Sequence, residues 1–178
     1  MTLSDAFADL VGHLDPPMIV VTTAAGGQRA GCLVGFHAQC SIEPPRYVVW
    51  LSKANHTLRV GLLAPRFAIH FLAADQHDVA ELFGGTTGDE VDKFSRCSWT
   101  EGPDGVPLLE GFDHRIVGRR GAVLDDGSDH VCVVIEPDDV RAEGPLRPLR
   151  LSDVNDITPG HQAEERPVPA EERDSRQL

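Results

Sequence analysis

Residues 18–36, Met-Ile-Val-Val-Thr-Thr-Ala-Ala-Gly-Gly-Gln-Arg-Ala-Gly-Cys-Leu-Val-Gly-Phe, place two extended apolar runs on either side of a glycine pair. The first run, 18–23, is rich in β-branched residues, and the second run covers 29–36. Glycine adopts the positive φ angles of a tight turn without steric cost, and the pair lies between the two runs. This stretch therefore predicts a β-hairpin turned by glycine.

Short segments with strand or helix signals continue on both sides of the hairpin. Before it, apolar residues at helical spacing predict an amphipathic helix over roughly 4–14, capped by Thr2 or Ser4 and ended by Asp15-Pro16-Pro17. After it, we expect helices following Asn55 and following Asp75, which serves as a cap. The further strands that we expect are 47–52, 67–71, 114–124, 129–135 and 146–151.

Many short strands separated by turns predict a mainly β fold with a few peripheral helices. This pattern fits a closed or nearly closed antiparallel barrel better than a doubly wound sheet. A chain of 178 residues is long enough for one buried core and too short for two. We expect one domain over 1–154 and a disordered acidic tail over 155–178, because the tail lacks bulky apolar side chains.

The formal net charge of −12 opposes binding to nucleic acid or to anionic membrane surfaces. The apolar runs are strand-sized and the amino terminus lacks a signal pattern, so we expect a soluble cytoplasmic protein. The four cysteines form no CxxC pair and have no histidine at zinc-finger spacing. We therefore expect free thiols and no metal site.

A polar turn at Ser52-Lys53-Ala54-Asn55-His56-Thr57 connects an expected strand to an expected helix. Backbone N–H groups, an amide and a hydroxyl at the start of a helix hold a phosphate well, and Lys53 or Arg59 adds positive charge. The alternative is an ordinary helix cap, which the spacing alone favours.

A second candidate is the extended segment from Gly31 to Ser41, which ends in the rigid bend before Pro44-Pro45. Its backbone can pair edgewise with a flat heterocycle, and Gln39 and Ser41 offer side-chain hydrogen bonds. The alternative is a core strand followed by a proline turn.

Taken in order, these motifs resemble the flavin reductase family of the FMN-binding split β-barrel, an antiparallel, Greek-key-like fold. The match covers roughly residues 15–150 and rests on order and spacing together. The motifs are the hairpin strand with Val-Val-Thr-Thr, Ser41-Ile42-Glu43-Pro44-Pro45, Ser52-Lys53-Ala54-Asn55-His56-Thr57, Gln76–Phe83, Asp92-Lys93-Phe94, Val106-Pro107-Leu108-Leu109 and Gly127-Ser128-Asp129-His130.

The resemblance implies a homodimer with the flavin at the subunit interface. In this interpretation Asn55 and Thr57 hold the phosphate, Lys93-Phe94 closes over the site, and His130 is the catalytic residue near the stacked rings. The residues implied in cofactor binding are Leu33, Val34, Gly35, Phe36, Gln39, Cys40, Ser41, Ser52, Lys53, Asn55, His56, Thr57, Lys93 and Phe94.

Two departures from the family pattern concern the flavin pocket. Residues 33–36 are Leu-Val-Gly-Phe where family members usually carry Thr-Ala-Ser-Ser, so flavin contacts there have to come from backbone groups. The bulky Phe36 either narrows the pocket or stacks on a ring. In addition, Ser128 separates Gly127 from Asp129-His130, which lengthens that turn by one residue.

The function that follows is reduction of FMN, or alternatively FAD, by hydride from NADH or NADPH, with reduced flavin passing to a partner monooxygenase. His130 either donates a hydrogen bond or a proton to the ring, or only pairs with Asp129. The alternatives are a flavin carrier that binds without turnover and an oxidase similar to the pyridoxamine-phosphate oxidase branch of the same barrel.

Overall fold

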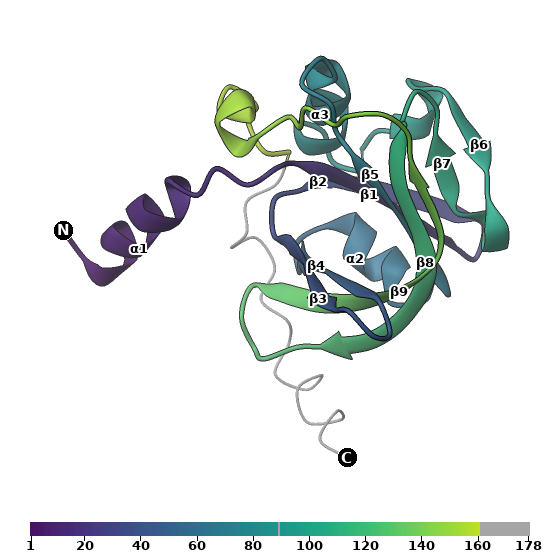
Figure 1. Cartoon of the computed structure of the whole chain (residues 1–178), viewed down its shortest axis with the longest axis horizontal. Helices are drawn as coiled ribbons and strands as arrows, with labels where there is room; N and C mark the ends of the chain where they lie inside the picture. Colours follow the sequence, from purple (N-terminus) through teal and green to yellow (C-terminus); the bar gives the residue numbers. More distant parts are fainter. Residues whose placement is uncertain (89, 161–178) are drawn as a thin grey trace.

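The computed structural model describes residues 1–88 and 90–160, which form a mainly antiparallel β fold (Figure 1). The helices are α1 (Leu3–Gly12), α2 (His56–Gly61) and α3 (His77–Gly84), with short 3-10 turns at Lys93–Ser95, Pro103–Gly105 and Leu151–Val154. The strands are β1 (Ile19–Ala25), β2 (Gln28–Val34), β3 (His37–Ser41), β4 (Arg46–Ser52), β5 (Arg66–Phe71), β6 (Trp99–Glu101), β7 (Pro107–Leu109), β8 (His114–Leu124) and β9 (His130–Ala142).

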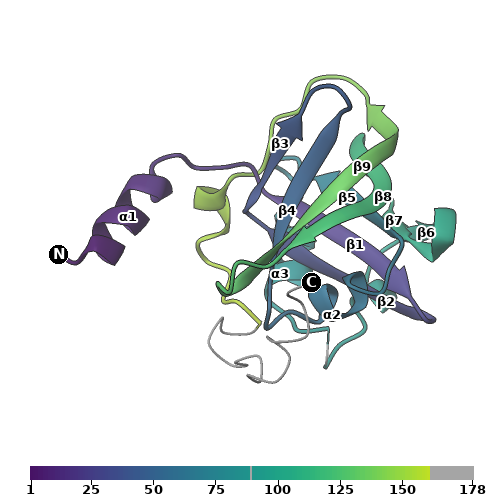
Figure 2. The ribbon, with the colours of Figure 1, turned by 90° about the horizontal axis from the view of Figure 1, so that it is seen from below.

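Seven strands form one sheet in the order β2-β1-β5-β8-β9-β4-β3, and β6 pairs with β7 separately. The sheet curls, so that β4 and β3 lie opposite β1 and β2 (Figures 1 and 2). The chain passes from one edge strand to the other through Gly35 and Phe36, and the Trp50 N–H donates to the Phe36 carbonyl at 2.9 Å. The predicted mainly β fold with few helices is confirmed, and the sheet is a half-barrel.

The predicted hairpin is β1 paired with β2. Ala25 lies opposite Gln28, and the two residues between them, Gly26 and Gly27, have φ angles of 58° and 77°. These angles belong to the left-handed region that glycine favours, as the sequence predicts. The long hairpin predicted over 114–135 is also confirmed, although β9 continues to Ala142.

The interior of the curled sheet is the main core, and α2 covers one end of it with the buried Leu58. A second core lies on the outer face of β1, where α3 and the turn at 151–154 pack against the sheet. The second core contains Met18, Val20, Leu72, Ala80, Phe83, Phe94, Leu109, Phe112, Leu149 and Val154.

Two local predictions are wrong. Helix α3 begins after Gln76, not after a capping Asp75, and the Gln76 side chain instead accepts from the Ala73 N–H and donates to the Gly111 carbonyl. The expected strand at 146–151 is reduced to isolated bridges of Pro148 with Ala73 and of Arg150 with Pro17. Proline has no N–H to donate, so a continuous ladder cannot form there.

Helix α1 confirms the amphipathic helix expected near 4–14, and Thr2 caps it in a capping box with Asp5. None of its residues is buried, and the helix projects away from the sheet (Figures 1 and 2). The described chain continues to Gly160, and Ile157 packs against the second core, although the sequence assigned 155 onward to the tail. The rest of that predicted tail, 161–178, lies outside the described residues.

Buried His70 of β5 connects the sheet to β7. Its Nε2 accepts from the Leu109 N–H at 3.0 Å, so its Nδ1 carries the hydrogen that faces the Val20 carbonyl at 3.3 Å. Burial lowers the pKa of His70 from 6.5 to about 3. The imidazole is therefore neutral in the folded protein at neutral pH.

We expect acid to destabilise the fold through His70. The unfolded chain takes up this proton near pH 6.5 and the folded chain only near pH 3, so stability is lost as the pH falls through that window. Through His70 the free energy of unfolding falls by at most about 1.4 kcal/mol per pH unit in this window. Urea denaturation across the window measures it, and His70→Gln should flatten the dependence. His13→Gln, at the exposed C-cap of α1, is the control; equal slopes for His70→Gln and the wild type would contradict the assignment.

Candidate functional site

The turn from β4 into α2 is organised by Asn55. Its Oδ1 accepts from the Thr57 N–H at 2.9 Å, which makes Asn55 the cap of α2. Thr57 is only 1% exposed, and the side chains of Thr57 and Asn55 lie close enough to the Cys32 thiol on β2 to lower its pKa, against the larger effect of burial. Burial raises the pKa of Cys32. The turn is thus tied to β2 through its side chains.

Lys93 lies directly beside this turn. It is 5% exposed, and its Nζ donates to the Phe83 carbonyl at 2.9 Å and to the Gly31 carbonyl at 3.1 Å. Burial lowers the pKa of Lys93. Phe94 is buried as well and packs edge-on against Phe83 and Trp99. The structure places Lys93 and Phe94, which we expected to close over the site, in the packed layer between β2 and α3.

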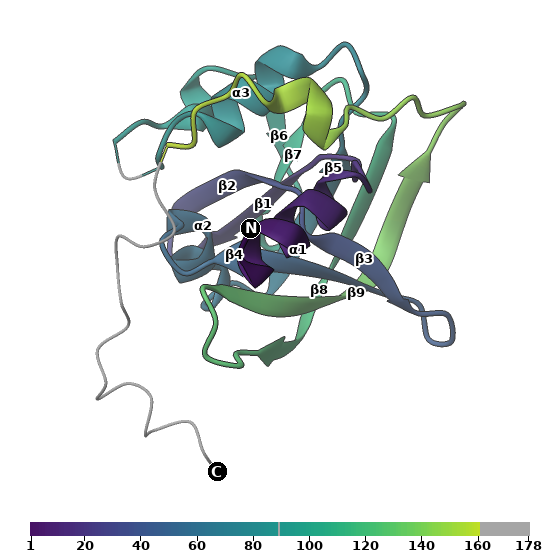
Figure 3. The ribbon, with the colours of Figure 1, turned by 90° about the vertical axis from the view of Figure 1, so that its left-hand side faces the viewer.

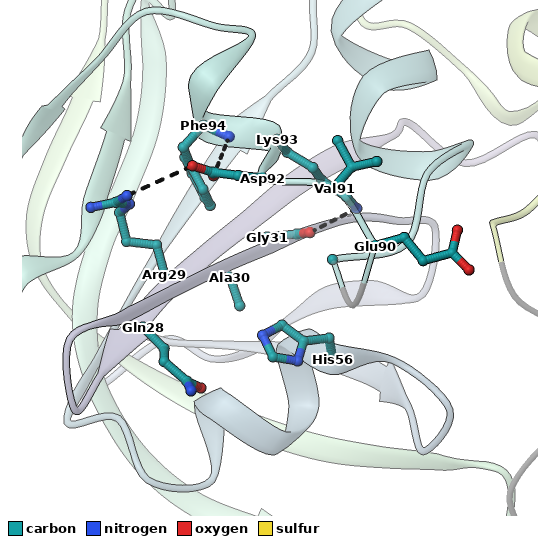
Figure 4. Close-up of a pocket in the computed structure, with 11 residues that line it drawn as sticks. Gln28, Arg29, Ala30, Gly31, His56, Glu90, Val91, Asp92, Lys93 and Phe94 are labelled. Carbon is teal, nitrogen blue, oxygen red and sulfur yellow. Dashed lines mark hydrogen bonds and ion pairs between the residues drawn. The ribbon is translucent and has the colours of Figure 1, made fainter.

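Two cavities flank Lys93 and share Gly88 as a second lining residue. The first, of about 380 Å³, opens beside β2 and α2, and the His56 ring and Gln28 lie below β2 in Figure 4. Its lining includes Gln28, Arg29, Ala30, Gly31, His56, Glu90, Val91, Asp92 and Phe94.

The second cavity, of about 360 Å³, lies between α3 and residues 151–160, which we call the C-terminal strap. Its lining includes Met18, Leu33, Asn55, Phe83, Gly84, Thr86, Thr87, Leu151, Val154, Asn155, Ile157 and Pro159. We call it the strap cavity. It brings predicted residues Leu33, Asn55 and Lys93 together with strap residues that the sequence did not indicate.

His130 stands at the other side of the β4–α2 turn, opposite Ser52 in the β4–β9 ladder. The His130 and Phe36 rings are 5.1 Å apart between centroids and tilted by 58°. His130 Nδ1 lies 2.8 Å from the Asp129 carboxylate, and this hydrogen bond lowers the pKa of Asp129. The backbone N–H of Lys53 donates to the Asp129 carbonyl. The Lys53 ammonium pairs with the Asp125 carboxylate, which neutralises its charge locally.

Large apolar side chains are exposed on the sheet face next to Phe36. Trp50 and Leu124 both lie opposite Cys132 of β9, so the two side chains are on the same face. Phe36 is 59% exposed, Trp50 36% and Leu124 60%. This face combines apolar surface with the Phe36–His130 pair.

A family model described as "Flavin reductase like domain" matches residues 11–154, which is most of the chain. The chain belongs to this flavin reductase family.

Individual relatives agree with the family assignment. The FMN reductase (NADH) SmoA of Agrobacterium fabrum is 33% identical over 137 residues, covering 75% of this chain and 74% of that protein. The FMN reductase (NADH) RutF of Stutzerimonas stutzeri is 30% identical over 120 residues, covering 64% and 67%. A crystal structure of an FMN-binding protein from Thermus thermophilus superposes with a TM-score of 0.67 at 28% identity, covering 72% and 71%.

Some of the predicted cofactor-binding residues lie far from the β4–α2 turn in this flavin reductase chain. Gln39 lies opposite Tyr47, and Ser41 opposite Arg46, at the far end of β4 from Ser52. The break at Gly35-Phe36 turns the chain, so the segment from Leu33 to Ser41 is not one strand along one pocket. Cys40 lies on the same far stretch and is exposed. Val34 is buried in the main core.

Other lining residues were missed by the sequence reasoning. Arg29 faces Asp92 at 3.9 Å and lies over the Trp99 ring at 4.8 Å, yet in the sequence it is one polar residue after a turn. The sequence alone assigns Thr86 and Thr87 to the end of a helix and Asn155 to the start of the tail. Their spatial neighbours are distant in sequence, so no local pattern marks them.

The residues present fit a phosphorylated flavin. The Lys93 ammonium and the Asn55 amide beside the strap cavity are donors that suit phosphate, and the exposed Phe36 ring beside His130 suits a flat heterocycle. Among the described residues no group of histidine, cysteine or carboxylate side chains has the arrangement of a metal site. The helices of the described chain are too short or too polar to span a bilayer.

We expect Lys93→Met to lower the free energy of unfolding by about 1–3 kcal/mol, because it leaves the buried Gly31 and Phe83 carbonyls without their donor. Arg141→Met, which removes an exposed ion pair with Glu143, is the matched control with a loss below about 1 kcal/mol. Urea denaturation without added flavin measures both. Equal losses would show that the Lys93 ammonium does not tie β2 to α3.

Proposed function

We propose that this chain is an NAD(P)H-dependent flavin reductase that binds FMN, or alternatively FAD, and works as a homodimer. The observation that carries the proposal is that both halves of a flavin site border one turn, 52–57. Asn55 within the turn lines a cavity together with Lys93, and Ser52 at the start of the turn lies opposite His130, whose ring is next to Phe36. Membership of the flavin reductase family supports the same reaction.

The residues of the chain bind and orient in this proposal, and none acts as a nucleophile. Bound flavin supplies the hydride-accepting ring. Asn55 and Lys93 hold the phosphate, with backbone groups of Leu33–Gly35 facing the ribityl chain and Phe36 lying against the ring. Such fixed positioning of two reactants is the main contribution that the protein makes to hydride transfer.

In this proposal His130 holds or moves a proton beside the flavin ring. Its Nδ1 faces the Asp129 carboxylate, which favours the tautomer with hydrogen on Nδ1 and keeps the ring in place. Nε2 is then the atom that points its lone pair or proton toward the reaction.

The exposed apolar face with Phe36, Trp50 and Leu124 supports the homodimer. Three large apolar side chains next to the candidate ring site are costly to leave in water, and a second copy covers them by two-fold packing. The flavin ring then lies at the subunit interface. Two curated relatives are named as reductase components of flavin-dependent or aromatic monooxygenases, which supports transfer of reduced flavin to such a partner.

The proposal is tested by anaerobic mixing of the flavin-loaded chain with NADH or NADPH. Bleaching of the flavin absorption band is expected with at least one of them. Binding of flavin without bleaching would instead indicate a carrier or an oxidase of the same fold.

We expect His130→Gln to slow single-turnover flavin reduction about 10- to 100-fold, because proton transfer by a positioned side chain typically contributes at least that much. Flavin affinity should stay within twofold, since His130 lies at the ring and away from Lys93. His114→Gln, at the start of β8, is the control. An unaltered rate for His130→Gln would remove His130 from the mechanism.

A further inference from the structure

The strap cavity is a slot lined by both apolar and polar side chains. Leu33 of β2 and Phe83 of α3 line one part, and Ile157 and Pro159 of the C-terminal strap line another. Its volume of about 360 Å³ falls in the range of small-molecule sites. The slot is therefore large enough for a planar ring system with a sugar.

The C-terminal strap is held against the body of the protein at both ends. The Leu151 N–H donates to the Pro16 carbonyl at 3.0 Å, and the Gly160 N–H donates to the Gly84 carbonyl at 3.1 Å. Between them, Asp156 pairs with His77 of α3 at 2.9 Å. Figure 3 shows the yellow end of the described chain running beside α3. The wall of the slot is thus built by specific contacts.

Gly84 lets the end of α3 approach β2 closely. A Cβ atom at Gly84 would lie 2.7 Å from the Leu33 Cδ2 atom and 3.2 Å from the Leu33 Cβ atom, so a side chain there would displace Leu33. The Ile157 Cγ2 atom of the strap lies 3.6 Å from the same position, which is an ordinary van der Waals distance. Gly84 therefore sets how closely α3 packs against Leu33 on one side of the slot.

Polar groups lie at defined places around the apolar walls. Asn55 and Lys93 mark the side that faces the proposed phosphate position, and Asn155 lines the cavity from the strap. An amide side chain offers one donor and one acceptor, the pair that matches the edge of adenine. Apolar walls, an amide and an adjacent phosphate position together match an adenosine phosphate.

We propose that the strap cavity is an adenylate subsite, in which Leu33, Phe83, Ile157 and Pro159 enclose the adenosine and Asn155 bonds its edge. This inference rests on the proposed function, because the adenylate belongs either to FAD or to the nicotinamide dinucleotide. The strap then determines how well the chain distinguishes ligands with an adenylate from FMN, which has none. FMN uses the Asn55–Lys93 side without the strap.

The test uses the full chain with Pro159→Trp, which fills the slot, and Asn155→Leu, which removes the amide at similar size. Thr158→Trp is the matched control, since Thr158 is exposed and does not line the cavity. Fluorescence titration gives the Kd values for FMN and FAD, and steady-state kinetics with FMN as acceptor gives the KM for NADH. Thermal unfolding checks that each variant folds. If Pro159→Trp does not fold, the test uses Asn155→Leu alone.

We expect Pro159→Trp and Asn155→Leu to weaken one adenylate ligand about tenfold, the loss of roughly one good hydrogen bond or contact set, with the FMN Kd within twofold. A higher Kd for FAD assigns the subsite to the flavin, and a higher KM for NADH assigns it to the nicotinamide dinucleotide. Equal weakening of FMN, or no change for either adenylate ligand, overturns the inference while the proposed function stands. A wild-type chain that binds neither flavin overturns both.

Discussion

Strand β1 has to be buried on both of its faces, and the arrangement of the other elements depends on this constraint. Ile19 and Val21 point into the curled sheet, whereas Val20 points to the second core under α3, and all three are fully buried. Thr22 and Thr23 are buried too, and their hydroxyls donate to the Pro107 and Arg66 carbonyls. Buried polar groups are tolerated here because each has a partner. The strand is a wall shared by two cores.

The position of β1 between the two cores also explains where the candidate site lies. Strand β2, which pairs with β1, runs along the boundary between the two cores, with Cys32 on the main-core side and Leu33 on the side of α3. Lys93 spans this boundary by donating to a carbonyl on β2 and to one on α3. Both cavities are lined by that lysine. A ligand at this boundary contacts elements of both layers.

In this strongly acidic chain, an anionic ligand can be held only by a few positively charged or N–H donors close to it. The net charge of −12 gives no general attraction for an anionic nucleotide, so any phosphate has to be held by a few donors at short range. Lys53, which lies within the turn, is paired with Asp125. The buried Lys93 is held instead by the backbone carbonyls of Gly31 and Phe83. The two lysines therefore differ in their partners, a carboxylate for Lys53 and two backbone carbonyls for Lys93.

Local sequence determined the hairpin at Gly26-Gly27, the Thr2 and Asn55 caps, the long β8–β9 hairpin and the mainly β class, because each depends on residues a few positions apart. The order of the motifs, through the resemblance to the family, pointed to Asn55, Lys93, Phe36 and His130 as site residues, and their roles stay a prediction. The tertiary structure alone decided that Gln39 and Ser41 lie at the far end of β4, that Lys93 is buried, and that the segment after Leu151 walls a cavity. These features arise from contacts between segments tens of residues apart, whose free energy is set by burial and by pairing partners that no local pattern encodes.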